Sequence, residues 1–310
     1  MKQKGNKYLL KVLILLIIVY CLDFTIGFCL RKYYFSQTQG EYSVLTRTIE
    51  NPKKQKYDLL VFGSSKAKRH YNPAIISDSL NITCYNAGND GMGILYSNAL
   101  FDLIIEKYNP EFVLLDVIND ELDYASFSYD QLGVFNPYVD KYPILWETLK
   151  LRSPFEKIKH ISKIYPFNSM ADKIIKGNMG ENSEIDIDGF SPEFGIWKES
   201  LKEIKFEEKQ LDTNKLVAFE SFLTKCKNRN IKIAVIFSPE YHHILNNSNS
   251  IGYIMEKCQE LDVDFISYKN DEYFSNNELF RDQRHMNEQG AIFFSTKLSS
   301  MIKKTLFTEQ

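Results

Sequence analysis

The sequence has few cysteines, and none of them stands in a metal-binding or redox spacing. Cys21 and Cys29 lie in an N-terminal apolar segment, while Cys84, Cys226 and Cys258 are far apart in the chain. A zinc site or a thioredoxin-like motif needs closely spaced cysteines, and a disulfide framework needs a dense, paired set. The cysteine pattern therefore supports neither a metal site nor a disulfide-rich fold.

The sequence also lacks an excess of charge of one sign. It has 38 Lys and Arg against 40 Asp and Glu, and no basic stripe is interleaved with aromatic residues. Because nucleic-acid binding needs a strong positive field, nucleic acid is not an expected partner. Apolar residues make up 44% of the chain and charged residues 25%, which is typical of a globular protein rather than a disordered one.

One long apolar run is present near the N-terminus, from Leu9 to Leu30. At a rise of about 1.5 Å per residue it matches a hydrocarbon layer of about 30 Å. Lys2, Lys4, Lys7 and Lys11 precede or begin it, and the positive-inside rule puts that end in the cytoplasm. We therefore predict a single-pass protein of the inner (cytoplasmic) membrane, with an extracytoplasmic C-terminal domain.

A cleaved signal peptide and a lipoprotein are the alternatives to a permanent anchor. Cleavage needs small residues after a short apolar stretch, but Phe28–Arg31 is bulky. Tyr20 and Phe28, which precede the two cysteines of the run, also fit a lipoprotein site poorly. Asp23 is costly inside a span unless it lies near the far interface or faces a partner.

After the anchor, strand-length apolar runs alternate with helix-length amphipathic segments, which predicts a parallel sheet covered by helices on both faces. The fold class is therefore α/β, a three-layer sandwich around a five-stranded parallel sheet. Strands are expected at 58–62, 82–85, 112–117, 231–237 and 263–266, and helices at 73–80, 94–108, 211–227, 250–261 and 291–304. The predicted organisation is a cytoplasmic N-terminus (1–8), a transmembrane anchor (9–30), a polar linker (31–56) and a catalytic-type domain (57–310), whose inserted lid or recognition segment covers about 124–210.

Two short motifs carry chemistry. Gly63-Ser64-Ser65 ends the first predicted strand, where a serine hydroxyl can be exposed while its own N–H faces a reacting oxygen. Asp282 stands three residues before His285, directly ahead of the last predicted helix, and a carboxylate at that spacing can orient an imidazole as a base. Each motif alone is common in loops, but their order along the chain makes the pair specific.

These motifs, together with Asn86-Ala87-Gly88-Asn89-Asp90-Gly91 and Val117-Ile118-Asn119-Asp120, resemble four sequence blocks of the SGNH/GDSL hydrolase family. The aspartate of the usual Gly-Asp-Ser is Ser64 here, as in membrane-anchored proteins similar to those of D-alanylation and polysaccharide O-acetylation. The resemblance implies a flavodoxin-like SGNH fold over residues 57–304, outside the insertion.

The resemblance implies acyl transfer by a catalytic triad of Ser65, His285 and Asp282, through an acyl-enzyme. The oxyanion hole would be the N–H groups of Ser65 and Gly91 and the side-chain amide of Asn119. No metal and no cofactor is implied.

Further candidates follow the fourth predicted strand. Tyr241 and His242 stand where a loop would border the active site, so they are possible substrate-binding residues, although a loop with satisfied polar groups is the simpler interpretation.

The expected substrate is an acylated glycan or another small ester, and the expected function is an O-acyl, above all O-acetyl, esterase or acyltransferase acting on an exported or cell-envelope polysaccharide. An acyltransferase would need an acyl donor, which a membrane protein that contacts Asp23 could supply. The alternative is a non-catalytic SGNH-like binding or assembly module for envelope glycan machinery.

Overall fold

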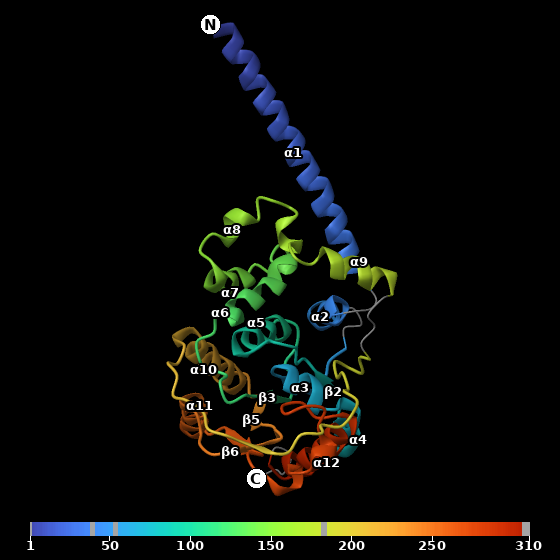
Figure 1. Cartoon of the computed structure of the whole chain (residues 1–310), viewed down its shortest axis with the longest axis vertical. Coiled ribbons are helices and arrows are strands. Elements are labelled where there is room, and N and C mark those ends of the chain that lie inside the picture. Colours follow the sequence, from blue (N-terminus) through green and yellow to red (C-terminus); the bar gives the residue numbers. More distant parts are fainter. Residues whose placement is uncertain (1, 38–40, 52–54, 181–184, 306–310) are drawn as a thin grey trace. The chain divides into compact units, whose positions relative to one another are not determined.

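The computed structural model describes residues 2–37, 41–51, 55–180 and 185–305, which form two compact units (Figure 1). The first unit combines residues 1–47 with 132–184, and the second combines 48–131 with 185–310. The chain therefore passes from the first unit into the second, returns to the first and then enters the second again.

The second unit is built around a five-stranded parallel sheet in the order β2-β1-β3-β5-β7. Counted along the chain this is the order 2-1-3-4-5 of flavodoxin-like folds, so the predicted fold class is confirmed. Two further short strands, which the sequence did not predict, pair in parallel as a separate sheet. The strands are β1 (Leu59–Phe62), β2 (Cys84–Asn86), β3 (Phe112–Asp116), β4 (Lys202–Ile204), β5 (Lys232–Phe237), β6 (His242–Ile244) and β7 (Asp264–Ser267).

Helices connect these strands and begin at recognisable caps. Asn72 accepts hydrogen bonds at the start of α4, where Pro73 is the first helical residue, and Asp212 and Ser248 cap α10 and α11 in the same way. The helices of this unit are α3 (Ser65–His70), α4 (Pro73–Leu80), α5 (Ile94–Ile105), α6 (Ser126–Asp130), α10 (Thr213–Asn228), α11 (Asn249–Glu260) and α12 (Glu288–Thr305), with short 3-10 helices η3 (Glu272–Phe274) and η4 (Asn277–Leu279).

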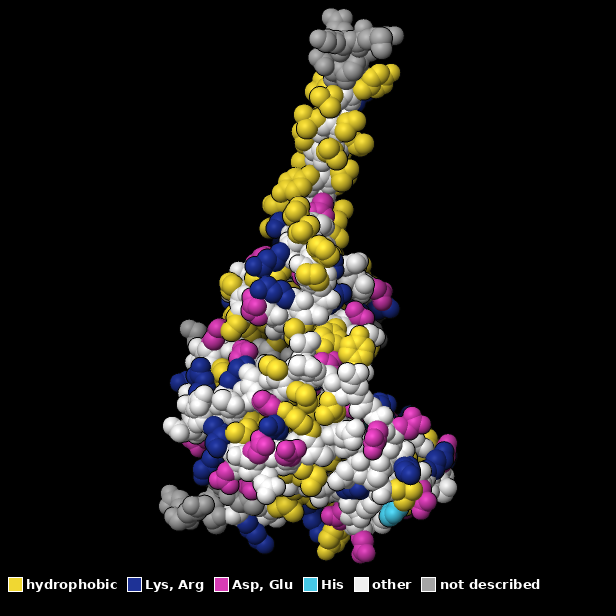
Figure 2. Space-filling view, turned by 90° about the vertical axis from the view of Figure 1, so that its left-hand side faces the viewer, with side chains coloured by type: hydrophobic (Ala, Val, Ile, Leu, Met, Phe, Trp, Pro, Cys, Tyr) yellow, Lys and Arg dark blue, Asp and Glu magenta, His cyan; other side chains and the backbone are white. Residues whose placement is uncertain are grey.

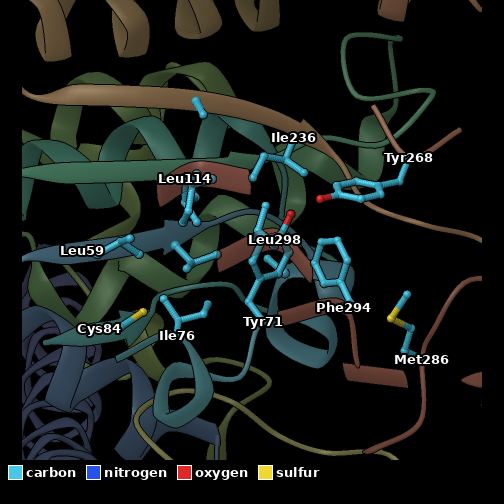
Figure 3. Packing of buried hydrophobic residues seen from close by; sticks show 14 of the residues in the cluster. Leu59, Tyr71, Ile76, Cys84, Leu114, Ile236, Tyr268, Met286, Phe294 and Leu298 are labelled. Atoms are coloured by element: carbon cyan, nitrogen blue, oxygen red, sulfur yellow. The ribbon is translucent and has the colours of Figure 1, made fainter. Parts of the chain in front are cut away.

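The sheet separates two apolar layers because neighbouring residues of a strand point to opposite faces. On one face, Phe62 packs against Phe101 of α5 and Phe222 of α10. On the other face, residues such as Leu59 and Leu114 join a cluster that includes side chains of α4 and α12 (Figure 3). Burial on both faces explains why the central strands are continuous apolar runs.

The first unit is helical. It holds α1 (Lys2–Ser36), the first part of α2 (Glu41–Glu50), most of η1 (Gln131–Tyr138), α7 (Leu145–Arg152), α8 (Glu156–Lys159), η2 (Tyr165–Phe167) and α9 (Ala171–Met179). Within the described residues, one helix is long enough and apolar enough to cross a membrane, judged by length and composition alone: Lys7–Ser36. Hydrophobic side chains cover this helix in the space-filling view (Figure 2).

The stretch predicted as a polar linker, 31–56, is mostly helical instead. Arg31–Ser36 continues α1, and α2 follows after residues outside the described part of the chain. Tyr42, Leu45 and Ile49 lie on one face of α2 and are buried. Glycine, proline and lysine in this stretch suggested a linker, but the spacing of three buried apolar residues favours a packed helix.

Candidate active site

Ser65 lies at the turn between β1 and α3. Gly63 has a φ of +144°, and a Cβ there would lie 2.8 Å from the carbonyl oxygen of Asp116, so the turn requires glycine. Ser64 is the extended residue before the helix, and Ser65 is its first residue. The N–H of a first helical residue has no partner within the helix, which leaves the amide of Ser65 available at the same point as its hydroxyl.

Ser65, His285 and Asp282 form one hydrogen-bonded chain in the second unit. Ser65 Oγ is 2.8 Å from His285 Nε2, although 220 positions separate the two residues in sequence. His285 Nδ1 is 2.9 Å from Asp282 Oδ2 and 3.1 Å from Oδ1. The order of these contacts is that of a nucleophile, a base and an orienting carboxylate.

The electrostatics of Asp282 fix the tautomer of the imidazole. Partial burial raises the pKa of this carboxyl, but the hydrogen bond with the His285 side chain and those from the N–H groups of Arg284 and His285 outweigh it and hold the pKa well below its usual range. The ionised carboxylate accepts, so Nδ1 of His285 donates. Nε2 is thereby left to accept the proton of Ser65.

The loop that carries Asp282 and His285 is closed by backbone hydrogen bonds. Phe280 and Met286 pair as an antiparallel bridge, and the N–H of Arg281 donates to the carbonyl of His285 at 2.8 Å. The carboxylate and the imidazole therefore sit on a small closed loop directly before α12, and their relative position depends little on distant parts of the chain.

The predicted oxyanion donors, Gly91 and Asn119, lie in loops after β2 and β3. Gly91 has a φ of +70°, and its N–H has no hydrogen-bond partner within the part of the chain that the structure describes. Asn119 is buried, and its side-chain nitrogen likewise lacks a partner among the described residues. A buried amide donor without a partner is uncommon in native proteins and is a sign of a functional position.

A charged pair lies buried beside Ser65, the candidate nucleophile, and was not predicted from the sequence. Lys66, the residue after Ser65, donates to Glu240 Oε1 at 2.9 Å and to the carbonyl of Ser238 at 2.9 Å. Burial raises the pKa of Glu240, but the Lys66 ammonium and the neighbouring His242 outweigh it and lower the pKa to about 2. The pair ties the first turn of α3 to the loop after β5.

A second buried contact supports the base, and the sequence gave no signal for it. His70, at the end of α3, accepts the N–H of Met286 at its Nε2, at 3.1 Å, and its Nδ1 is 3.2 Å from Ser238 Oγ. Burial lowers the pKa of His70 well below its ordinary value, and Lys66 and His285 lower it further, so the ring is neutral and can accept. The backbone directly after His285 is therefore held by a histidine of the helix that begins at Ser65.

The residues predicted to touch substrate are buried. The ring of Tyr241 is tilted against that of Phe280, with centroids 5.5 Å apart, and the N–H of Tyr241 donates to the carbonyl of Gln283 at 2.9 Å. His242 is a buried residue of β6, with Nδ1 3.8 Å from Glu240 Oε2. Both side chains are nearly as buried as that of Asn119, and the backbone contact of Tyr241 supports the loop that carries Asp282 and His285.

Part of the predicted insertion packs against the strand before the Gly91 loop. The carbonyl of Asp188 accepts the N–H of Asn86 at 2.9 Å, and the N–H of Ser191 donates to the carbonyl of Lys68 at 3.1 Å. Gly189 has a φ of +86°, and a Cβ there would overlap the carbonyl oxygen of Asn86. Residues 188–191 therefore brace β2 and α3 from outside.

No metal-binding cluster of three or more His, Cys, Asp or Glu side chains is found within residues 2–37, 41–51, 55–180 and 185–305.

Among solved structures, the chain is similar to several ester-cleaving proteins, whereas no family model and no curated protein matches it. The psychrotrophic esterase EstA from Pseudoalteromonas sp. has 10% identity and a TM-score of 0.44, covering 81% of this chain and 98% of its own. A candidate acylhydrolase from Bacteroides fragilis has 11% identity and a TM-score of 0.43, covering 84% and 96%. A candidate lipolytic protein of the G-D-S-L family from Desulfitobacterium hafniense has 11% identity and a TM-score of 0.36, and the match covers 78% of this chain and 98% of that protein. The function proposed below depends on the geometry of the site itself.

Proposed function

We propose that this chain is a serine hydrolase or acyltransferase acting on O-acyl esters, held in the inner membrane by its N-terminal helix with the second unit outside the cytoplasm. The observation that carries the chemistry is the hydrogen-bonded chain in which Ser65 Oγ lies 2.8 Å from His285 Nε2 and His285 Nδ1 lies 2.9 Å from Asp282 Oδ2. The fold brings Ser65 and His285 together across 220 positions of sequence.

The proposed reaction begins when His285 takes the proton of Ser65 and the serine oxygen attacks the ester carbonyl. The carbonyl oxygen becomes an oxyanion, which the N–H groups of Ser65 and Gly91 and the amide of Asn119 would stabilise. The imidazolium then gives its proton to the leaving alcohol, and an acyl-enzyme on Ser65 remains. Water or a sugar hydroxyl, activated by the same imidazole, releases the acyl group.

The proposed substrate class is an acylated, above all O-acetylated, polysaccharide of the cell envelope or one that is being exported. An anchor followed by an extracytoplasmic domain would meet glycans at the membrane surface, which supports this class. In the described structure the carboxylate of Asp23 already accepts hydrogen bonds from Ser162 and the backbone of Lys163, so we no longer propose it as the contact for an acyl-donor protein.

A fluorophosphonate probe tests the catalytic proposal because it reacts only with an activated serine. We expect rapid labelling of the full chain, loss of labelling in Ser65→Ala, and retention in the matched control Ser64→Ala, whose hydroxyl makes no capping hydrogen bond. If the folded protein resists labelling, the alternative of a non-catalytic binding or assembly module is favoured instead.

Hydrolysis and transfer are separated by the acceptor. The substrate for this test is an ester with a labelled acetyl group. If water resolves the acyl-enzyme, the rate at which free labelled acetate is released should not change when oligosaccharide is added. An acyltransferase should instead move the acetyl group to the sugar, with a matching loss of free acetate.

A further inference from the structure

One face of α1 is packed within the first unit, and it reaches far up the helix. Asp23, Gly27, Arg31, Tyr34 and Gln37 follow a helical spacing and are buried or partly buried, whereas the residues between them are mostly exposed. The stripe from Asp23 to Tyr34 extends about 16 Å along the helix axis. The first unit therefore covers one side of the lower part of the apolar helix.

The upper end of this stripe is a clamp between Asp23 and the loop after α8. The carboxylate of Asp23 accepts the hydroxyl of Ser162 and the N–H of Lys163, each at 2.6 Å, and the N–H of Ile164 at 3.5 Å. A Cβ at Gly27 would lie 2.4 Å from the carbonyl carbon and oxygen of Lys163, so the loop backbone touches the helix backbone there. The loop is fixed at the height of Asp23.

The helix above the clamp is too short to cross a bilayer by itself. Tyr8–Leu22, exposed throughout, has a length of about 22 Å, against a hydrocarbon layer of about 30 Å. Phe24 and Phe28, on faces of α1 away from the clamp, are also exposed and apolar. A membrane that covers the apolar helix must therefore extend past Asp23, and it then reaches the loop that Asp23 holds.

The segment next to this loop presents apolar side chains that are largely exposed. Phe155, Ile158 and Ile161 are 61%, 62% and 67% exposed, a large value for three apolar residues within one turn and loop. Lys157 lies beside the ring of Trp146, with its ammonium 5.7 Å from the ring centroid. Apolar residues flanked by lysine and tryptophan are typical of a surface that enters the boundary between lipid headgroups and acyl chains.

We propose that residues 155–164, which we call the α8 corner, insert into the outer boundary of the lipid bilayer beside α1, and that Asp23 and Gly27 hold the corner at that depth. The lipid is recognised by its acyl chains through Phe155, Ile158 and Ile161. This inference depends on the membrane anchor of the proposed function, but not on the catalytic chemistry.

Depth-dependent fluorescence quenching tests the proposal in the full-length protein. Cys21→Ala and Cys29→Ala remove the two exposed cysteines, while Cys84, Cys226 and Cys258 are buried. In this background, single cysteines at Ile158, Ile161 and Val217 are labelled with a polarity-sensitive dye. Val217, on α10 of the second unit, is the matched control because it is 61% exposed and aliphatic.

The labelled proteins are reconstituted in vesicles of phosphatidylcholine and phosphatidylglycerol that contain lipids spin-labelled on the acyl chain. We expect blue-shifted emission and at least twofold stronger quenching for Ile158→Cys and Ile161→Cys than for Val217→Cys. Emission and quenching equal to those of Val217→Cys would overturn the proposal. A separate protein that carries Cys29→Ala alone keeps Cys21, and a dye on Cys21 reports the anchor: if that dye is not quenched, it is the membrane span that fails.

The clamp is tested by Gly27→Leu, because a larger side chain must push the backbone of Lys163 away. We expect the dye at Ile161 to lose most of its quenching in Gly27→Leu, while the dye at Cys21 stays quenched. Thr25→Leu, an exposed position of the same helix, is the control and should leave both signals unchanged. Unchanged quenching at Ile161 in Gly27→Leu would show that α1 does not hold the corner.

Discussion

Ser65 and His285, the proposed nucleophile and base, are each followed by a residue that is held by a buried contact. Lys66 comes after Ser65 and is held by Glu240, and the N–H of Met286 comes after His285 and is held by His70. Since proton transfer needs the hydroxyl and the imidazole within hydrogen-bond reach, small shifts of either backbone should be costly to the rate. Because these contacts are buried, they restrain the two backbones more than surface contacts do.

His70→Phe should lower kcat for a small acetyl ester by roughly 10- to 100-fold, because the N–H of Met286 loses its acceptor and His285 loses its fixed position. KM should change little. His70→Gln keeps an oxygen near the place of Nε2 and should recover part of the rate. Steady-state kinetics and the pH profile of kcat for both variants provide the measurement. Equal activity in the two variants, with equal losses of thermal stability, would assign His70 a structural role only.

Asn119→Ala should lower kcat by roughly 100- to 1000-fold and leave KM nearly unchanged, if the amide stabilises the oxyanion. The unfolding free energy should not fall, because the buried nitrogen of Asn119 has no partner in the described structure. Asp120→Ala, the neighbouring residue, is the control and should affect the chemical step much less. Full activity of Asn119→Ala on an acetyl ester would leave only the backbone donors, and unfolding would indicate a structural turn.

At the scale of elements, α3 is the part that joins the site together. It starts at Ser65, carries Lys66 toward the loop after β5 and ends at His70, which reaches the loop before α12. A helix this short is marginal by itself, so its buried contacts must stabilise it. The Lys66–Glu240 pair is the strongest candidate, because neither charge is exposed to water.

Glu240→Gln should lower the free energy of unfolding by about 3 to 5 kcal/mol at pH 7, because the Lys66 ammonium is left buried without its counter-charge. The pKa of Glu240 is lowered to about 2 in the folded protein, so its stabilising effect is present above the unfolded pKa and is lost as pH falls toward 2. The difference between wild type and variant should therefore shrink as pH falls from about 5 to about 2.

Urea unfolding in detergent, followed by circular dichroism at pH 7 and again at about pH 3, measures this difference. The double variant Lys66→Met with Glu240→Leu, which removes both charges, should be close to the wild type in stability. A single variant that costs less than about 1 kcal/mol at pH 7 would contradict the view of a tightly coupled pair.

The elements that could be predicted are those whose local pattern agrees with their environment. The five strands of the main sheet and the helices α4, α5, α10, α11 and α12 appear within a few residues of their expected positions. β4 and β6 were missed because His242–Ile244 and Lys202–Ile204 are short and polar, and only their pairing makes them strands. The helix α3 was missed because SKAKRH has no apolar face, and its burial depends on contacts from distant loops.

The candidate triad could be found from sequence because Ser65, Asp282 and His285 stand in short motifs at the ends of elements. Lys66 and His70 could not, because a lysine and a histidine in a polar hexapeptide indicate a solvated helix until their partners, 216 residues away for His70, are known. The same limit applies to Asp23, whose partners Ser162 and Lys163 come from a different region of the chain.

At the scale of the whole molecule, α1 does more than a cleavable signal would need to do. Gly27 and Tyr34 pack within the first unit, and Asp23 satisfies the hydroxyl of Ser162 and the N–H of Lys163. Cleavage between Asp23 and Gly27 would remove Asp23, and cleavage between Gly27 and Arg31 would remove both residues; either cut would leave the Ser162–Lys163 loop with unpaired groups. The structure of the first unit therefore favours a helix that is retained.

We expect the mature protein to keep its N-terminus and to expose everything after α1 outside the cytoplasm. A tag before Met1 and a second tag after Gln310 should stay on one polypeptide in the membrane fraction, since a retained anchor links them. Protease added outside spheroplasts should destroy the C-terminal tag and spare the N-terminal one, as the positive-inside rule requires for Lys7 and Lys11. A soluble product without the N-terminal tag would mean a cleaved signal, and a protected C-terminal tag would reverse the orientation. A protected C-terminal tag would also remove the support for an envelope glycan as substrate, while the hydrogen-bonded chain of Ser65, His285 and Asp282 would still predict an esterase.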